Sequence, residues 1–225
     1  MIGARRILGR DGAQAHDEFD PVSDGHFQFH DVFLRNQDDK ATGRIRCCRD
    51  EHINPSDPLG SYAGAMGLPQ FMPSNFRAYA VDFDHDNRRD IWHNSSDVIA
   101  SIGNYFAKHH WQAGRAVAVP VTAKGEAHAP RLHPVGENYK SALNKDLKPN
   151  LSLSELESLN LIISRQLPLD SKVKLLSFEQ QPQGEELWAA LDNFYVITRY
   201  NHSPLYAMAV YQLSLSILNK KGSFP

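Results

Sequence analysis

Apolar positions recur mostly at helical spacing along this chain from about residue 74 onward. Ser74 can cap a short helix that ends near Ala80, and Ser95 or Ser96 can cap a second, longer helix. The apolar face predicted for the second helix comprises Val98, Ile99, Ile102, Tyr105 and Phe106, with Gly114 after its end. The pattern therefore predicts two helices that flank an acidic stretch.

Two further capping patterns predict helices in the second half of the chain. A Ser-x-x-Glu box is formed by Ser152 with Glu155 or by Ser154 with Glu157, and Ser203-Pro204 is a typical N-cap followed by proline in the first helical position. The first helix is expected to run through Leu156, Leu159 and Ile162, and the second through Tyr206, Val210, Leu213 and Ile217 to Lys220, Lys221 and Gly222.

Strand-like alternation is limited to two segments. Valines alternate with small residues at 117–121, and apolar residues alternate with lysines at 172–175, which predicts two short strands. Residues 122–150 are rich in polar residues, proline and glycine and are predicted to form a loop. We therefore expect a mainly helical domain with a small β element between about residues 117 and 190.

The first 48 residues differ from the rest of the chain. They show neither apolar period over any length and contain many aspartates, so we expect this stretch to be disordered or divergent and the folded domain to cover residues 49–225. Cys47 and Cys48 are adjacent, which disfavours a disulfide between them.

Composition excludes two classes of partner. Of the 225 residues, 41% are hydrophobic and 22% are charged, as in ordinary globular proteins. The formal net charge of −2 argues against nucleic-acid binding, which needs a clustered excess of Lys and Arg. No apolar run approaches the roughly 20 residues of a membrane span, and the N-terminal sequence MIGARRILGRDG lacks the apolar region of a secretory signal.

The glycine-rich segment at residues 60–74 reads GSYAGAMGLPQFMPS. Each glycine costs a helix interior about 1 kcal/mol relative to alanine, so the segment is unlike an ordinary helix. Such a run indicates close backbone approach or unusual φ/ψ angles, which are common where a chain lines a ligand groove. The residues alone are equally compatible with a tight helix–loop junction that binds nothing.

Three long blocks, in the same order, resemble the lytic murein transglycosylase B family of peptidoglycan-cleaving enzymes. They read GSYAGAMGLPQFMPSNFRAYAVDFDHDNRRDIW, SDVIASIGNYFAKHHW and NFYVITRYNHSPLYAMAVYQL. The resemblance extends from about residue 49 to the C-terminus. It implies a lysozyme-like α+β transglycosylase fold that is mainly helical and carries an EF-hand-like loop.

The acidic stretch has the spacing of a calcium-binding loop. Asp82, Asp84 and Asp86 place carboxylates at positions one, three and five of an EF-hand, and the backbone carbonyl of Arg88 falls at position seven. Alternating aspartates alone are also compatible with a solvated acidic turn. The resembled family closes its site with an Asp at the start of the next helix, a place that Asp97 occupies. The resemblance therefore implies a structural Ca²⁺ bound between Asp82 and Asp97.

The resemblance also implies substrate-binding residues, position by position. A glycan groove needs aromatic faces for sugar rings and amides or hydroxyls for their polar rims. The implied contacts are Ser61, Met66, Gln70 and Phe71 in the first block, Tyr105 in the second, and Tyr200, Asn201 and Tyr206 in the third. Without the resemblance, Met66 and Phe71 are more typical of core residues than of ligand contacts, and Tyr105 is equally natural as a core residue. Gln70 is harder to place in a core, because a buried amide without partners costs about 1–3 kcal/mol.

The family's catalytic acid has no counterpart at the matching place. The resembled enzymes cleave the bond between N-acetylmuramic acid and N-acetylglucosamine without water: one Glu protonates the glycosidic oxygen and then accepts the proton of the muramoyl 6-hydroxyl, which closes a 1,6-anhydro ring. Their motif I-G-V-E-x-x-[aromatic]-G-R corresponds here to IGARRILGR, with Arg5 in place of the Glu. Arginine stays protonated and offers no acceptor, so it cannot perform this step.

No other N-terminal residue replaces that acid by its pattern. Glu18 and Glu51 are the only N-terminal glutamates, and neither has the motif around it. The catalytic residue is therefore unassigned, and residues 4–48 are interpreted as an out-of-frame or diverged remnant of the catalytic lobe.

We therefore expect a peptidoglycan lytic transglycosylase with impaired activity. A non-catalytic peptidoglycan-binding module and a calcium-stabilised interaction domain remain alternatives. The expected partner is the peptidoglycan glycan strand, bound by a monomer. The resemblance implies the periplasm or the periplasmic face of the outer membrane, reached through an upstream anchor because this sequence contains no export signal.

Overall fold

The computed structural model describes residues 27–28, 39–54, 56, 59–61, 63–123, 137–143, 146–179 and 184–221. The chain divides into two compact units. Unit 1 comprises Met1–Ala78 and Asp82–Val98, and unit 2 comprises Tyr79–Val81 and Ile99–Pro225.

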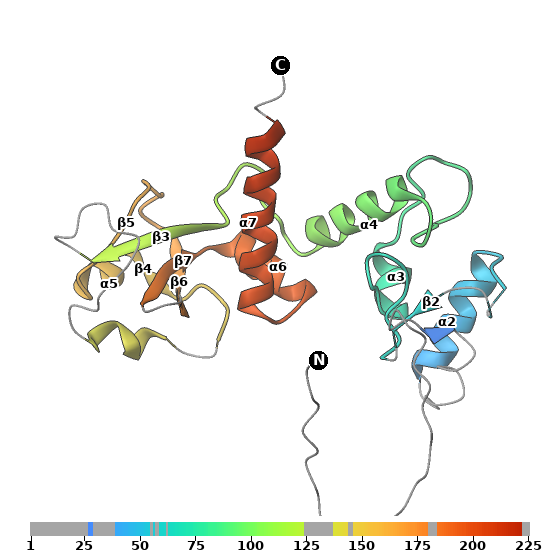
Figure 1. Ribbon diagram of the computed structural model, residues 1–225, viewed down its shortest axis with the longest axis horizontal. Helices are drawn as coiled ribbons and strands as arrows, with labels where there is room; N and C mark the ends of the chain where they lie inside the picture. The colour runs from blue at the N-terminus through green and yellow to red at the C-terminus, as the bar shows by residue number, and fades with distance from the viewer. Residues whose placement is uncertain are drawn as a thin grey trace, which may run out of the picture. The chain divides into compact units, whose positions relative to one another are not determined.

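Unit 2 is built on a five-stranded antiparallel sheet (Figure 1). Its strands are β3 (Ala118–Ala123), β4 (Leu151–Ser152), β5 (Leu161–Ile163), β6 (Lys172–Glu179) and β7 (Glu185–Ala190), in the order β4-β6-β7-β3-β5. The β6–β7 pair runs from Lys174 opposite Ala190 to Glu179 opposite Glu185. Side chains alternate between the two faces of a sheet, and apolar residues occupy both sets of positions in the central strands. Both faces must therefore be covered by other elements.

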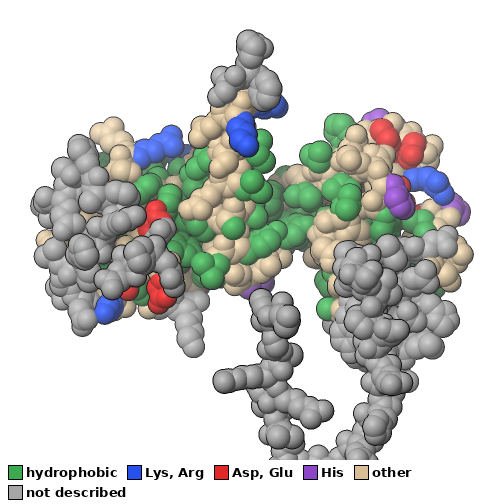
Figure 2. Space-filling view, viewed as in Figure 1, with side chains coloured by type: hydrophobic (Ala, Val, Ile, Leu, Met, Phe, Trp, Pro, Cys, Tyr) green, Lys and Arg blue, Asp and Glu red, His purple; other side chains and the backbone are tan. Residues whose placement is uncertain are grey.

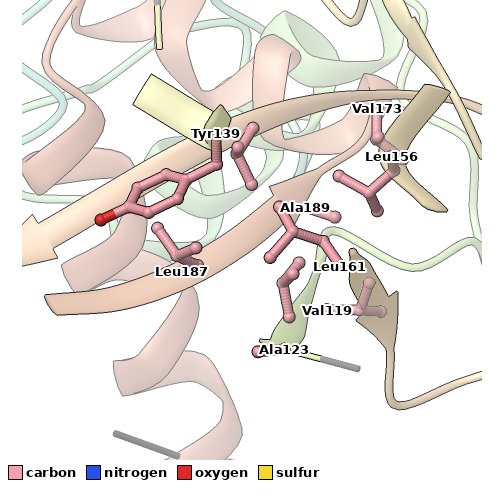
Figure 3. Close-up of a cluster of buried hydrophobic side chains, with 10 residues drawn as sticks. Val119, Ala123, Tyr139, Leu156, Leu161, Val173, Leu187 and Ala189 are labelled. Atoms are coloured by element: carbon pink, nitrogen blue, oxygen red, sulfur yellow. The ribbon is translucent and has the colours of Figure 1, made fainter. Parts of the chain in front are cut away.

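One face of the sheet is covered by the 3₁₀ helix η1 (Glu137–Ala142) and the short helix α5 (Leu153–Ser158). Figure 3 shows Tyr139 of η1 and Leu156 of α5 among the side chains of this face, including Val119, Val173 and Leu187. The opposite face is covered by α6 (Asp192–Tyr200) and α7 (Pro204–Lys221), whose contributions are Phe194, Ile197, Ala207 and Met208. Unit 2 therefore has three layers with the sheet in the middle.

Unit 1 contains α2 (Asp39–Asp50), α3 (Pro73–Tyr79) and a two-stranded sheet in which β1 (Phe27–Gln28) pairs with β2 (Leu59–Gly60). Its buried side chains include Cys47, Cys48, Phe76 and Ile91. The Sγ of Cys47 donates a hydrogen bond to the carbonyl of Pro73 (3.7 Å), which joins α2 to α3. Both cysteines are free thiols, and burial raises the pKa of the Cys47 thiol.

The helix α2 lies across the boundary expected at residue 48. Among the positions of α2 whose burial is described, Gly43, Cys47 and Cys48 are buried, and Gly43 and Cys47 have the i, i+4 spacing of a helix face. These residues are too small to produce a visible apolar period, so the sequence pattern missed a helix that begins ten residues before the expected domain start.

The long helix α4 (Ser95–Lys108) confirms the second predicted helix, although its cap is different. The Oδ1 of Asn94 accepts hydrogen bonds from the N–H groups of Ser96 (3.0 Å) and Asp97 (3.4 Å). Asn94 is thus the N-cap in place of the expected Ser95 or Ser96. The helix buries Val98 and Tyr105, whereas Ile99, which was predicted on the apolar face, is exposed.

The predicted helix through Ile162 is shorter than expected. The capping box of Ser152 and Glu155 starts α5, but the helix ends at Ser158 and residue 160, an asparagine, has a φ of 59°. Asparagine tolerates this left-handed conformation, which turns the chain so that Leu161–Ile163 pairs with β3 as strand β5. The sheet is consequently larger than the two strands predicted from alternation.

The helix α7 begins at the predicted Ser203-Pro204 signal, where the Ser203 hydroxyl accepts the N–H of Tyr206 (3.2 Å). The helix includes the predicted residues Tyr206, Val210, Leu213 and Ile217. Of these, Leu213 and Ile217 are exposed, and the buried positions are Ala207 and Met208. Figure 2 shows hydrophobic side chains at the surface of this helix. Apolar residues occur all around α7, so their spacing did not identify the buried side.

None of the helices in the described part of the chain is both long and apolar enough to cross a membrane.

The capping box gives a test of the fold. The hydroxyl of Ser152 accepts the N–H of Glu155 (3.2 Å), and the Glu155 carboxylate accepts the N–H of Ser152 (2.7 Å). Replacing Ser152 by Ala should lower the free energy of unfolding, measured by urea titration, by about 1 kcal/mol. Ser74→Ala, at an exposed position of α3, should change it by less than about 0.5 kcal/mol. Equal losses in the two variants would contradict the capping role.

The same box has a pH signature. Hydrogen bonds from the Ser152 N–H and hydroxyl hold the pKa of Glu155 below its ordinary value of 4.5. A lowered folded-state pKa contributes stability that is present above pH 4.5 and is lost as the pH falls through the folded pKa. The difference in unfolding free energy between the wild type and Ser152→Ala should therefore become smaller as the pH falls below 4.5.

Candidate functional site

The glycine-rich segment folds back on itself in unit 1. Isolated antiparallel bridges join Gly60 to Met66 and Met66 to Phe71, and the N–H of Ser61 donates to the carbonyl of Ala65 (2.8 Å). A Cβ added at Gly60 would lie 2.7 Å from the Ala65 carbonyl oxygen, a distance that real Cβ atoms do not show. The predicted close backbone approach is therefore present.

Gly67 joins this segment to the end of the acidic loop. Its φ is +61°, and an added Cβ would lie 2.5 Å from the carbonyl oxygen of Ile91. The next residue, Leu68, donates its N–H to that same oxygen (2.9 Å). Glycine is required here both by the left-handed backbone and by the space.

Three carboxylates converge in the acidic loop. Asp82, Asp84 and Asp86 each place an oxygen within 4.8 Å of the others. Acidic and histidine side chains gather on one patch of the surface in Figure 2. Backbone N–H groups of the loop point at these carboxylates, including those of Asn87 to Asp82 (2.9 Å) and of Arg88 to Asp86 (2.8 Å). Asn87 has a φ of 71°, so it makes the sharp turn that glycine usually makes at position six of an EF-hand.

Asp97 lies outside that cluster of three. Its side chain is fully buried, and its two oxygens accept the N–H of Phe83 (2.8 Å) and the N–H of Asp90 (2.9 Å). Asp97 thus ties both sides of the acidic loop to the start of α4. Asn94 adds a further tie by donating from Nδ2 to Asp84 (2.7 Å), which lowers the pKa of the Asp84 carboxyl.

Glu51 is occupied by a structural ion pair. Its Oε2 accepts the N–H of Arg89 (2.8 Å), and its Oε1 accepts from Nε (2.8 Å) and the second guanidinium nitrogen of the same residue. Glu51 is buried, and the Arg89 guanidinium also lies over the ring of Phe76 at 4.9 Å. Both oxygens are therefore used to hold the acidic loop against α2, a role that the sequence pattern did not reveal.

Four of the expected substrate-binding residues lie in unit 1. Gln70 is exposed, with a φ of 53°, and its Nε2 donates to the carbonyl of Gly67 (2.8 Å), which leaves its amide oxygen at the surface. Ser61 is half-buried and accepts the N–H of Ala65 (3.1 Å). Met66 and Phe71 are only 2% and 1% exposed, so they pack inside the unit. The surface of this segment therefore offers Gln70 and part of Ser61.

The other four lie in unit 2. Tyr105 is buried, and its hydroxyl donates to the carbonyl of Arg199 (2.7 Å). Its ring stacks on His109, with 4.1 Å between centroids, and meets Tyr200 edge to face at 5.0 Å. Asn201 is exposed at the C-cap of α6, and Tyr206 is 38% exposed. Tyr105 is thus a core residue that supports Tyr200, whereas Asn201 and Tyr206 are open to solvent.

Burial of this aromatic cluster affects its phenols. Desolvation raises the pKa of Tyr200, and the neighbouring Tyr206 and Tyr105 raise it further. Burial likewise raises the pKa of Tyr105. Both phenols therefore remain protonated hydrogen-bond donors at neutral pH. Tyr79, which meets Tyr105 edge to face at 4.8 Å, belongs to the same cluster, and its single aromatic position gave no signal in the sequence.

The Gly67 contact predicts the effect of a substitution. Gly67→Ala should destabilise the protein by at least about 1–3 kcal/mol from backbone strain alone, because alanine disfavours the left-handed conformation. Gly103→Ala is the matched control: it lies in α4, its added Cβ meets nothing within 4 Å, and the change should stabilise the helix by about 1 kcal/mol. Calorimetric melting measures both. A Gly67→Ala variant that melts with the wild type would contradict this account of the loop.

Comparison with known proteins gives the family. A family model described as a transglycosylase SLT domain matches residues 38–215. Membrane-bound lytic murein transglycosylase B of Escherichia coli (strain K12) is 40% identical over 169 residues, which are 75% of this chain and 42% of that protein. The chain thus spans less than half the length of that relative.

Solved structures agree. The soluble lytic transglycosylase SltB1 from Pseudomonas aeruginosa has a TM-score of 0.75 and 37% identity, covering 87% of this chain and 64% of that one. The Escherichia coli lytic transglycosylase Slt35 in complex with calcium has a TM-score of 0.68 and 33% identity over 86% of this chain and 60% of its own. SltB3 from Pseudomonas aeruginosa in complex with NAG-NAM-pentapeptide has a TM-score of 0.63 and 29% identity over 81% and 47%.

The match of the family model begins at residue 38, next to the start of α2, and so includes the helix that the sequence pattern missed. The fold is the lysozyme-like fold of the lytic transglycosylases, with helices and an antiparallel sheet. The chain belongs to the transglycosylase SLT domain family, among relatives of the membrane-bound lytic murein transglycosylase B.

Proposed function

We propose that this chain binds the glycan strands of peptidoglycan and is a lytic transglycosylase with impaired cleavage. The observation that carries the binding proposal is Gln70, an exposed amide held by the Gly67 carbonyl on a loop whose backbone packs closely at Gly60 and Gly67. A fixed amide loses little conformational freedom when a ligand binds, which favours recognition of a polar sugar rim.

Each unit, taken by itself, carries groups suited to a glycan. In unit 1 the free amide oxygen of Gln70 accepts a hydrogen bond from an N-acetyl N–H or a sugar hydroxyl. In unit 2 the ring of Tyr206 offers an apolar face, and Asn201 offers an amide that both donates and accepts. Met66, Phe71 and Tyr105 act by supporting these groups from within, since they are buried.

The relatives support a peptidoglycan ligand. The SltB3 structures are complexes with NAG-NAM-pentapeptide and with NAG-anhNAM-pentapeptide. The latter ligand contains the anhydro sugar that a lytic transglycosylase forms. By the same relationship we place this chain in the periplasm, as the name of the membrane-bound relative suggests.

Cleavage is proposed to be weak or absent because no glutamate in the described part of unit 1 is placed to act as the acid. Arg5 and Glu18 lie outside the described residues. Glu51 is the only glutamate in the described part of unit 1, and Arg89 engages both of its oxygens. A general acid must hold a proton within reach of the glycosidic oxygen, which this ion-paired carboxylate does not provide.

We infer in addition that the acidic loop holds a structural Ca²⁺ and is EF-hand-like. The donor set fits, because calcium prefers oxygen ligands and the carboxylates of Asp82, Asp84 and Asp86 converge at EF-hand positions. The relative Slt35 was solved in complex with calcium. The carbonyl of Arg88 would complete the set at position seven, and Asp97 would supply either a ligand or the bonds that hold the loop closed. Such an ion would supply charge neutralisation and no chemistry.

Two alternatives keep part of this proposal. A non-catalytic binding module retains glycan binding without any cleavage. A calcium-stabilised interaction domain retains the acidic loop without glycan binding.

Binding is tested by co-sedimentation with purified murein sacculi. Gln70→Ala should weaken binding about two- to tenfold, the effect of one hydrogen bond of about 0.5–1.5 kcal/mol. Gln70→Asn, which suits the positive φ better, should also weaken it because the shorter side chain withdraws the amide. Gln212→Ala, an exposed glutamine on α7, serves as control. Equal binding by all four proteins would reject the proposed contact, and no binding by the wild type would favour the interaction domain.

The ion site is tested by calorimetric titration of Ca²⁺ into metal-free protein. The wild type should bind one ion and gain thermal stability, by about 2.7 kcal/mol at a hundredfold excess over Kd. Asp84→Ala should abolish both effects, whereas Asp170→Ala, an exposed aspartate of unit 2, should leave both unchanged. Calcium binding that survives in Asp84→Ala would contradict the assignment.

A further inference from the structure

A cavity lies entirely within unit 2, and none of the residues proposed above to bind glycan or calcium lines it. Its volume is about 250 Å³. Three segments line it: residues 112–116 after α4, residues 165–172 before and at the start of β6, and residues 191–193 at the start of α6.

The walls of this cavity are held in place by a buried amide. Asn193 is 1% exposed; its Oδ1 accepts the N–H of Gln112 (2.8 Å), and its Nδ2 donates to the carbonyls of Gln112 (2.8 Å) and Arg115 (3.1 Å). The N–H of Leu191 donates to the carbonyl of Val117 (2.9 Å) and closes the loop at its other end. The first wall is therefore fixed to the α6 terminus before any ligand arrives.

Positive charge dominates the lining. Arg115, Arg165 and Lys172 line the cavity, against a single carboxylate, that of Asp192. Within the described part of the chain none of the three cations forms a salt bridge. Lys172 interacts at longer range with the exposed Glu155. Three cations around one carboxylate leave an excess positive charge that an anion would neutralise.

The start of α6 adds to this field. Its N-cap is Leu191, whose side chain makes no capping hydrogen bond. The first N–H groups of a helix carry partial positive charge, and here they end at the cavity. Asp192 in the first turn offsets part of that charge.

The size and the remaining lining indicate what the anion is attached to. Cavities that enclose drug-sized ligands are typically about 300–1,000 Å³, so this one suits a smaller group than a disaccharide. Ala116, Leu167, Pro168 and Leu191 give it apolar walls, and the Gln112 and Gln166 side chains give it amides. Small apolar side chains fit such walls, amides pair with peptide groups, and arginine forks pair with carboxylates.

We propose that this cavity binds the carboxyl-terminal end of a short peptide with small apolar side chains, such as the peptide attached to a peptidoglycan strand. Arg115 and Arg165 bind the terminal carboxylate, and Lys172 adds charge at the rim. This assignment of a natural peptide rests on the proposed function, because the peptide is brought to the cavity by the glycan that carries it. The site lets the protein distinguish strands whose peptides end in a free carboxylate.

The test is calorimetric titration of the full chain with D-alanyl-D-alanine, with L-alanyl-L-alanine and with the carboxyl-terminal amide of each. At least one free dipeptide should bind, and its amide should bind about tenfold or more weakly because the charge-assisted hydrogen bonds are lost. Arg165→Gln and Arg115→Gln should each weaken the free dipeptide by a similar factor. Arg77→Gln, at an exposed arginine of α3 in unit 1, should not. All three arginines are exposed, so none of these substitutions should unfold the protein. Melting curves of the variants check that they remain folded.

The proposal would be overturned if no dipeptide bound the wild type or if the amide bound as well as the free acid. It would also be overturned if Arg165→Gln and Arg115→Gln bound the free dipeptide as tightly as the wild type does. Inorganic phosphate that binds the same site as tightly as the dipeptide would also overturn it, because the site would then recognise any oxyanion. Failure of the proposed glycan binding can be distinguished from failure of the proposed peptide site. Sacculi that fail to bind while the dipeptide binds reject the glycan assignment alone, and sacculi that bind in a Gln70-dependent way without any dipeptide binding reject the cavity alone.

Discussion

The close approach of Gly67 to the carbonyl of Ile91 is the constraint on which unit 1 depends. There is no room for a Cβ at this point, and the N–H of Leu68 uses the same carbonyl as its acceptor. The contact fixes the glycine-rich segment, which carries Gln70, against the end of the acidic loop. A residue with a side chain at position 67 would separate the two, so the position of Gln70 and the geometry of the aspartate cluster share one cause.

Charge in unit 1 is arranged so that buried carboxylates are satisfied and exposed ones are crowded. Asp97 and Glu51 are buried, and they accept hydrogen bonds from loop N–H groups and from Arg89. Asp84 and Asp86 are exposed and Asp82 is half-buried, and one oxygen of each lies within 4.8 Å of the others, where like charges repel. The first arrangement stabilises the loop by itself. The second favours a bound cation, which is the physical basis for expecting that calcium stabilises the protein.

Local sequence patterns predicted helix starts that depend on residues close together in the chain. The Ser152–Glu155 box and the Ser203-Pro204 start are both present, because a cap is decided within one helical turn. Features decided by tertiary packing were not predicted. The buried side of α7 depends on a small residue, Ala207, which packs against the sheet. Among the residues of α2 whose burial is described, those that face its core are Gly43, Cys47 and Cys48. The end of α5 depended on one left-handed residue, Asn160.

In the candidate site, too, local features could be predicted from the sequence, whereas features that depend on tertiary packing could not. The spacing of the aspartates was sufficient to bring Asp82, Asp84 and Asp86 together, since all three lie in one loop. Whether an aromatic residue is a ligand contact or a core residue could not be read from spacing, and Phe71 and Tyr105 are both buried. The role of Glu51 was hidden because its partner, Arg89, lies 38 residues away in the sequence.

This chain is proposed to retain peptidoglycan recognition while its cleavage is impaired, because no glutamate in the described part of unit 1 is placed to act as the acid. The most direct measurement is mass spectrometry of the soluble products after purified sacculi are incubated with the protein. The account predicts that the protein sediments with the sacculi while 1,6-anhydromuramoyl products stay near the level of a protein-free incubation. Steady release of those products in proportion to the protein added would contradict it and would require an acid elsewhere in the chain.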